Sequence, residues 1–225
     1  MNEEISERLE RAAQVYSNNT VLGAIVNAIP YIGGSLDKLI SARGHKIAQE
    51  RIKSLLEQLQ TDMGTVKENT IDRTFLESEE WFDLVVKALE SAARTRDSDK
   101  ITLYSRILRN SVIQSNRKTY SPEDYLTILA ELTPREVELA KAIYAQQSDR
   151  PKDNENELHW ARRRGWENLA AESGLDEKDL IFLLIRLERS GLIRQVTGSY
   201  LGYEGGVYVI TEVFRKLMDY LEKDT

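Results

Sequence analysis

The sequence predicts a mainly α-helical protein, with an N-terminal helical domain over residues 1–120 and a second domain over residues 121–225. Three observations support this prediction. Apolar residues recur three and four positions apart along most of the chain, as they do on one face of a helix. Several of these patterns begin at a Ser, Thr or Asp that can cap a helix, and two end at a glycine. Two short stretches, 192–196 and 207–210, are apolar in the way that strands are.

The N-terminal domain is expected to consist of amphipathic helices. One covers residues 3–17, and a longer one runs from Ser35 to about Val66. Another begins after Ser78, whose side chain can accept a hydrogen bond from the free amides of a first turn. A fourth runs over residues 97–116.

Residues 20–40 form an unusually apolar segment, interrupted by one proline and a Gly-Gly pair. Between Val21 and Leu36, Asn27 and Ser35 are the strongly polar residues. This stretch is shorter than the roughly 18 to 20 apolar residues that a helix needs to span a bilayer. We interpret it as a buried core helix followed by a kink, and keep a membrane-active segment over residues 21–36 as an alternative.

The second domain begins with two helix starts of the same kind, at residues 121–122 and 133–134. In each, a Ser or Thr that can cap the helix precedes a proline, which is favoured in a first turn. The second of these helices is expected to reach Gln147. A polar loop over residues 148–158 then follows.

Two further helical patterns are joined by the turn Gly174-Leu175-Asp176, where Gly174 can end the first helix and Asp176 can cap the second. The second pattern ends at Ser190-Gly191, and the two strands and a closing amphipathic helix follow. This order resembles a winged-helix domain with a small two- or three-stranded wing. Winged helices elaborate the helix-turn-helix fold, which usually binds the DNA major groove.

The composition argues against several functional classes. The chain has 225 residues, no cysteine and a formal net charge of -6, so disulfides and thiolate metal sites are excluded. His45 and His159 are far apart in sequence, and no phosphate-binding glycine loop or nucleophile motif is present. We therefore expect no enzymatic activity, cofactor or metal. The charged N-terminus does not resemble a signal peptide, which favours a cytoplasmic protein.

The helix expected after Asp176 has an unusual surface for a DNA-reading helix. Its buried stripe is predicted at Leu180, Leu184 and Leu187, so Phe182 and Ile185 should lie away from that stripe and face a partner. The first turn carries acidic residues, which phosphate would repel. We therefore predict that this helix contacts protein, either the N-terminal helices or a second copy in a homo-oligomer.

Double-stranded DNA is the alternative partner. Arginines before and after this helix could grip phosphates, and two tyrosines of the wing could stack or enter a groove. Ordinary solvated charges and locally packed tyrosines explain the same residues equally well. The candidate DNA-binding residues are Arg162, Arg163, Arg164, Arg186, Arg189, Arg194, Tyr200 and Tyr203. A membrane partner is not expected.

Several short motifs are similar to those of bacterial helical proteins with a C-terminal winged helix, of the abortive-infection alpha type of phage-defence protein. They are Ala28-Ile29-Pro30-Tyr31-Ile32-Gly33-Gly34, Leu76-Glu77-Ser78-Glu79, Arg94-Thr95-Arg96, Leu103-Tyr104-Ser105-Arg106, and the segment Leu126 to Leu139 with its Leu-Thr-Pro-Arg-Glu sequence. The resemblance covers about half of the chain. It implies a bacterial cytosolic setting and permits a defence role, and it assigns no functional residue.

Taken together, these patterns favour a non-enzymatic regulatory or scaffold protein that binds a macromolecule. The winged helix would serve mainly for protein contact or self-association. A DNA-binding transcriptional regulator is the first alternative. A membrane-active phage-defence effector that uses residues 21–36 is the second.

Overall fold

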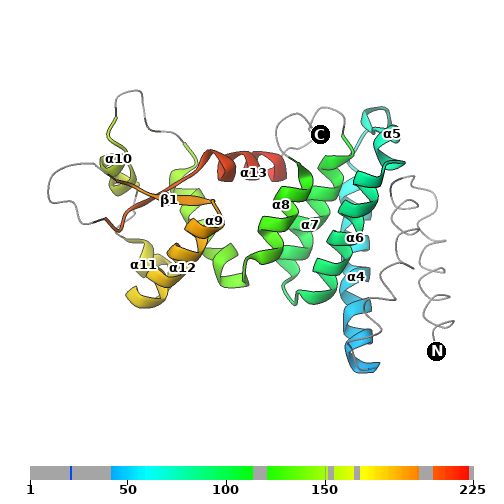
Figure 1. Ribbon diagram of the computed structural model, residues 1–225, viewed down its shortest axis with the longest axis horizontal. Coiled ribbons are helices and arrows are strands. Elements are labelled where there is room, and N and C mark those ends of the chain that lie inside the picture. The colour runs from blue at the N-terminus through cyan, green and yellow to red at the C-terminus, as the bar shows by residue number, and fades with distance from the viewer. Residues whose placement is uncertain are drawn as a thin grey trace. The chain divides into compact units, whose positions relative to one another are not determined.

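The computed structural model describes Val21 and residues 42–113, 121–149, 151, 155–164, 168–197 and 205–222. Over these residues the protein is mainly helical, as predicted, with ten α-helices and a two-stranded antiparallel sheet near the C-terminus (Figure 1). The chain forms two compact units. Unit 1 comprises Met1–Glu131 and Tyr220–Thr225, and unit 2 comprises Leu132–Asp219.

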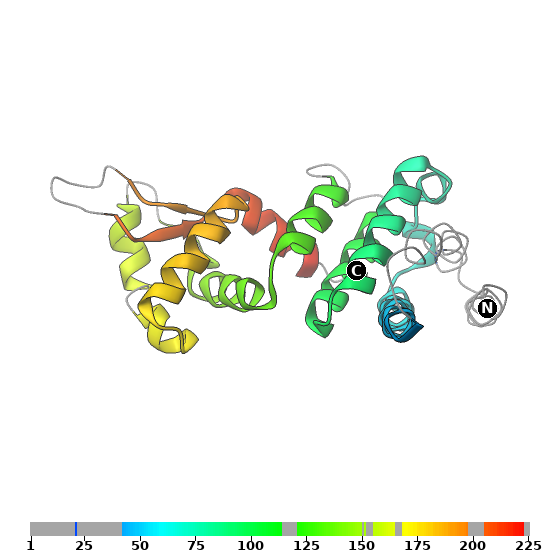
Figure 2. The ribbon, with the colours of Figure 1, turned by 60° about the horizontal axis from the view of Figure 1, so that its bottom comes forward.

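Unit 1 is a layered helical bundle. Its described helices are α4 (Ala42–Met63), α5 (Arg73–Leu76), α6 (Glu79–Arg94), α7 (Ser98–Ser111) and α8 (Pro122–Glu131), with a short 3-10 turn at Glu68–Thr70. Figures 1 and 2 show α4, α6 and α7 side by side, and α8 packs against α6 and α7. The buried apolar stripe of α4 contains Ile52, Leu55, Leu56, Leu59 and Met63.

Local capping explains where the helices of unit 1 begin. The Ser78 hydroxyl accepts a hydrogen bond from the Trp81 amide at 3.2 Å, which confirms the predicted start of α6.

Helix α7 ends at Ser111, whereas the sequence predicted a helix up to residue 116. The Val112 carbonyl accepts a hydrogen bond from the Asp72 amide at 2.8 Å, and Ile113 forms an isolated β-bridge. These tertiary contacts replace further helical bonds.

Unit 2 contains α9 (Pro134–Gln147), α10 (Glu157–Arg163), α11 (Leu169–Ser173), α12 (Glu177–Arg189), β1 (Ile193–Gln195), β2 (Tyr208–Ile210) and most of α13 (Glu212–Glu222). Helix α10 was not predicted, because its first residues were assigned to a polar loop. The Asn156 side chain accepts hydrogen bonds from the amides of Leu158 and His159, at 3.0 and 3.2 Å, and so caps this helix. Burial of Leu158, Trp160 and Ala161 anchors it.

The turn between α11 and α12 agrees with the prediction. Gly174 is left-handed, with φ 65°, and Asp176 accepts a hydrogen bond from the Asp179 amide at 2.8 Å. Gly191, with φ 77°, follows the end of α12. These two turns lie on either side of α12. Glycine suits both positions because residues with a side chain avoid this backbone conformation.

The sheet consists of β1 and β2, with Ile193 opposite Ile210 and Gln195 opposite Tyr208. Direct ladder bonds join Val196 to Val207 and Leu192 to Thr211. Since hydrogen-bonded pairs alternate along an antiparallel ladder, the backbone groups of Tyr208 and Ile210 point away from β1.

A side chain satisfies two of these outward groups. The Gln147 amide group donates to the Tyr208 carbonyl at 3.1 Å, and its oxygen accepts from the Ile210 amide at 3.0 Å. The described part of the sheet is therefore two-stranded, and α9 is tied to the outer edge of β2.

Among the described residues, no helix combines the length and the apolar character needed to cross a membrane. The predicted helix over residues 3–17 lies outside these residues. So does the apolar segment 20–40, apart from Val21, which is fully buried.

Candidate protein-interaction surface

Helix α12 exposes three large apolar side chains. Ile181, Phe182 and Ile185 are 50%, 59% and 51% exposed. We refer to these three residues as the α12 apolar face. Phe182 and Ile185 thus lie outside the buried stripe, as their spacing predicts, and Ile181 was not singled out from the sequence. Isolated exposed apolar residues are common, whereas these three are neighbours on one helix and form a continuous apolar patch.

The buried side of α12 differs from the prediction at Leu180 and Leu183. Leu183, Leu184 and Leu187 are buried, whereas Leu180 is half-buried. The reason is tertiary, because α12 packs against both α9 and β1 and so needs a broader apolar side than one stripe.

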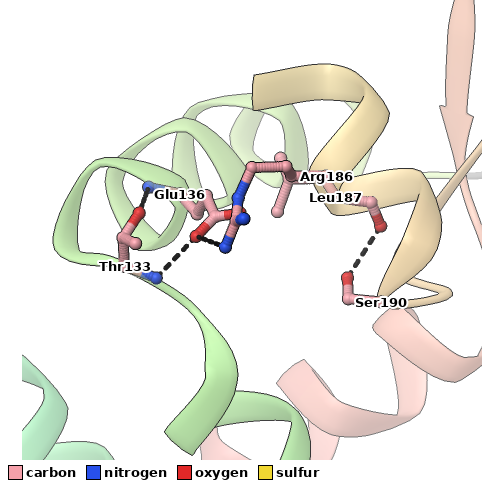
Figure 3. Close-up of polar contacts among 5 residues, drawn as sticks. All are labelled: Thr133, Glu136, Arg186, Leu187 and Ser190. Atoms are coloured by element: carbon pink, nitrogen blue, oxygen red, sulfur yellow. Dashed lines mark hydrogen bonds and ion pairs between the residues drawn. The ribbon is translucent and has the colours of Figure 1, made fainter. Parts of the chain in front are cut away.

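Arg186 anchors α12 to the start of α9, as Figure 3 shows. Its Nε donates to Glu136 Oε1 at 2.5 Å, and its Nη2 lies 3.3 Å from Glu136 Oε2. The same carboxylate accepts the Thr133 amide at 2.6 Å, while the Thr133 hydroxyl accepts the Glu136 amide at 3.3 Å. The Thr133 cap was predicted from its Thr-Pro start. The structure adds the reciprocal bond to Glu136, which completes a capping box, and Arg186 adds a link between two helices.

The anchor also restrains the α12 apolar face. The guanidinium of Arg186 lies 5.9 Å from the centre of the Phe182 ring, within the range of a cation–π contact. Glu136 holds the guanidinium, so the cation lies at a defined place beside the exposed ring of Phe182.

The protonation of Glu136 provides a test of this anchor. Burial acts to raise the pKa of Glu136, but hydrogen bonds from Arg186 and Thr133 outweigh burial and hold the pKa below its ordinary value. A carboxyl whose folded pKa is lowered stabilises the fold above its unfolded pKa of about 4.3. This stabilisation is lost as the pH falls through the folded pKa.

We therefore expect Glu136→Gln to reduce the free energy of unfolding most at neutral pH. The difference from the wild type should shrink below about pH 4.3, as Glu136 becomes protonated. Urea unfolding of both proteins between neutral and acidic pH measures this difference. Glu138→Gln is a matched control on the same helix, because Glu138 is exposed. A difference that stays constant with pH would contradict the role of the Glu136 carboxylate.

Most of the candidate DNA-binding arginines face carboxylates. Arg163 pairs with Glu155, and Arg164 pairs with Asp149. Arg194 lies 2.5 Å from Glu157, as an exposed side chain of β1. Exposed ion pairs contribute little stability, but they reduce the positive potential that phosphate would meet.

The remaining candidate residues lie on different elements or outside the described residues. Arg186 is engaged by Glu136, whereas Arg162 and Arg189 are exposed on α10 and α12. Tyr200 and Tyr203 lie outside the described residues. The sequence alone could not show which carboxylates approach these arginines.

The start of α12 is acidic. Asp176, Glu177 and Asp179 are all exposed, and Asp179 lies 3.9 Å from Arg135. An α-helix stabilises negative charge at its N-terminus, so these residues suit the helix itself. They also oppose the approach of a polyanion to this end of α12.

Within the described part of the chain, no group of three or more His, Asp or Glu side chains is placed to hold a metal ion. Comparison of the chain with protein-family models, with curated proteins and with solved structures found no match.

Proposed function

We propose that this chain is a non-enzymatic regulatory or scaffold protein whose unit 2 is a winged helix used for protein contact, mainly self-association. The observation that carries the proposal is the exposure of Ile181, Phe182 and Ile185 in the middle of α12. The order α9, α11, α12, hairpin and α13, with a glycine turn before α12, supports the winged-helix assignment.

Two further observations favour protein over DNA as the partner of α12. Four of the candidate arginines, Arg163, Arg164, Arg186 and Arg194, are paired with carboxylates. The first turn of α12 contains Glu177 and Asp179, whereas a helix that enters the major groove benefits from donors to bases and phosphates. Burial of the α12 apolar face against protein requires neither unpaired arginines nor donors in the first turn of α12.

Light scattering of the purified protein over a dilution series tests the proposal. At micromolar concentration we expect a mass above the 25.8 kDa of one chain, falling toward that value on dilution. A gel shift with double-stranded DNA across a salt series should show no binding even at low salt. A chain that remains monomeric but binds DNA with a steep salt dependence would favour the DNA-binding alternative.

The resemblance to abortive-infection proteins adds a biological setting to the proposal. On that resemblance alone, the setting is the bacterial cytoplasm and a phage-defence role is open. Nothing in the described residues favours membrane activity, since the segment that suggested it lies outside them apart from Val21.

A further inference from the structure

We propose that the α12 apolar face is covered by α12 of a second copy of this chain, running in the opposite direction across a two-fold axis. The inference rests on the proposed function and specifies its partner and its geometry. It follows from the distribution of charge and apolar residues along α12.

One row of side chains on α12 is self-complementary. Glu177, Ile181, Ile185 and Arg189 are spaced by four residues, so they form a single ridge along the helix surface. All four are exposed. The ridge therefore presents an acid, two apolar residues and a base, in that order.

The orientation of the second copy follows from this order. When two such ridges run in opposite directions, the isoleucines meet at the centre and each Glu177 approaches the Arg189 of the other copy. In the parallel orientation, acid would face acid and base would face base, which is unfavourable. The helix dipoles also favour the opposed orientation.

The neighbouring charges support the same orientation. At the start of α12, the three acids Asp176, Glu177 and Asp179 outnumber Lys178, and at its end the bases Arg186 and Arg189 outnumber Glu188. Each end therefore has a net charge opposite to that of the other end. Arg186 is already held by Glu136, so Arg189 is the base that remains for contact across the axis.

The size of the apolar face indicates that the charged ends belong to the contact. A stable protein interface buries roughly 800 Å² on each partner. A complete aromatic side chain supplies about 150–250 Å², and the three side chains of the face are each about half exposed. They can form the centre of an interface, and the turns on both sides must complete it.

Packing of this kind has a known geometry. Ridges of residues spaced by four pack into the matching grooves of another helix at a crossing angle of about −50°. In that arrangement the ridges of the two helices run alongside each other. A two-fold axis through the centre of the ridge relates the two copies, because the ridge is apolar on both sides of its midpoint.

Charge exchange between Glu177 and Arg189 tests the orientation. Glu177→Lys and Arg189→Glu should each weaken self-association about tenfold at low salt, because each places like charges at both ends of the contact. A mixture of the two variants should recover wild-type association, since every acid again meets a base. The double variant Glu177→Lys/Arg189→Glu should show wild-type association without a second protein.

Sedimentation velocity of the four proteins and of the mixture measures these effects, with Glu138→Lys as an exposed charge-reversal control on α9. Thermal melts establish that each variant is folded. If the mixture and the double variant remain as weak as the single variants, the opposed orientation is wrong. Parallel helices would instead leave each single variant as strongly associated as the wild type, and the mixture of Glu177→Lys with Arg189→Glu would associate more tightly than the wild type, because each position would then face its own counterpart. That pair of results would also overturn the opposed orientation.

Failure of this inference is separable from failure of the proposed function. Suppose that Phe182→Asp abolishes association, but that neither the mixture nor the double variant of Glu177→Lys and Arg189→Glu recovers wild-type association. The chain then self-associates through α12 in another orientation. If the wild type is monomeric at every concentration, both proposals fail.

Discussion

Phe182→Asp is expected to abolish self-association without unfolding unit 2. Phe182 is 59% exposed in the single chain, so its replacement removes little of the core. In the associated state, the new carboxylate would lie buried at the centre of the contact without a partner. Loss of a central aromatic residue typically costs about 2–4 kcal/mol of association free energy, and the buried charge adds to this cost.

Light scattering and thermal melts of Phe182→Asp and Arg163→Ala check this expectation. Arg163 is exposed and pairs with Glu155 at the surface, so its replacement should change neither mass nor melting temperature appreciably. Phe182→Leu is the conservative variant, because it keeps an apolar side chain on α12, and it should retain most of the association. An unchanged mass for Phe182→Asp would argue against the apolar face as the contact.

Gln147→Leu is expected to destabilise unit 2 by about 2–4 kcal/mol, because a buried donor and a buried acceptor lose their partners together. Gln147 is fully buried, and its side chain satisfies the Tyr208 carbonyl and the Ile210 amide. Leucine has a similar volume, so the loss comes from unpaired polar groups and not from a large cavity. Both strand residues are themselves buried, so water cannot easily replace the amide.

Gln146→Leu is the matched control, one residue away on the same helix. Gln146 is only half-buried, and its Nε2 donates to Glu172 in an exposed contact at 2.8 Å. We expect a loss below about 1 kcal/mol there. Urea unfolding compares the two variants, and amide hydrogen exchange at Ile210 locates the effect. Equal losses in the two variants would show that the Gln147 side chain does not secure the edge of β2.

Much of the local structure could be predicted because its causes are local. Capping at Ser78, Thr133 and Asp176 joins a side chain to an amide three residues away, so the residue types and their spacing are sufficient. The left-handed turn at Gly174 is equally local. By contrast, α10 was missed because Asn156, its cap, stands within a polar stretch that has the composition of a loop.

On α12 too, some features follow from local sequence and others depend on tertiary packing. The spacing of apolar residues along α12 sufficed to predict that Phe182 and Ile185 leave the buried stripe. It could not show that Leu183 would be buried and Ile181 exposed, since that depends on how α9 and β1 surround the helix.

By itself, the sequence determined the mainly helical fold, the starts of α6, α9 and α12, and the acidic, apolar character of α12. These properties depend on residues close together in the chain. Only the tertiary structure decided that Glu136 holds Arg186, that Glu157 faces Arg194 and that Gln147 completes the edge of β2. Such pairings join residues tens of positions apart, and charge or polarity alone does not select one partner among many until packing brings two groups within hydrogen-bonding distance.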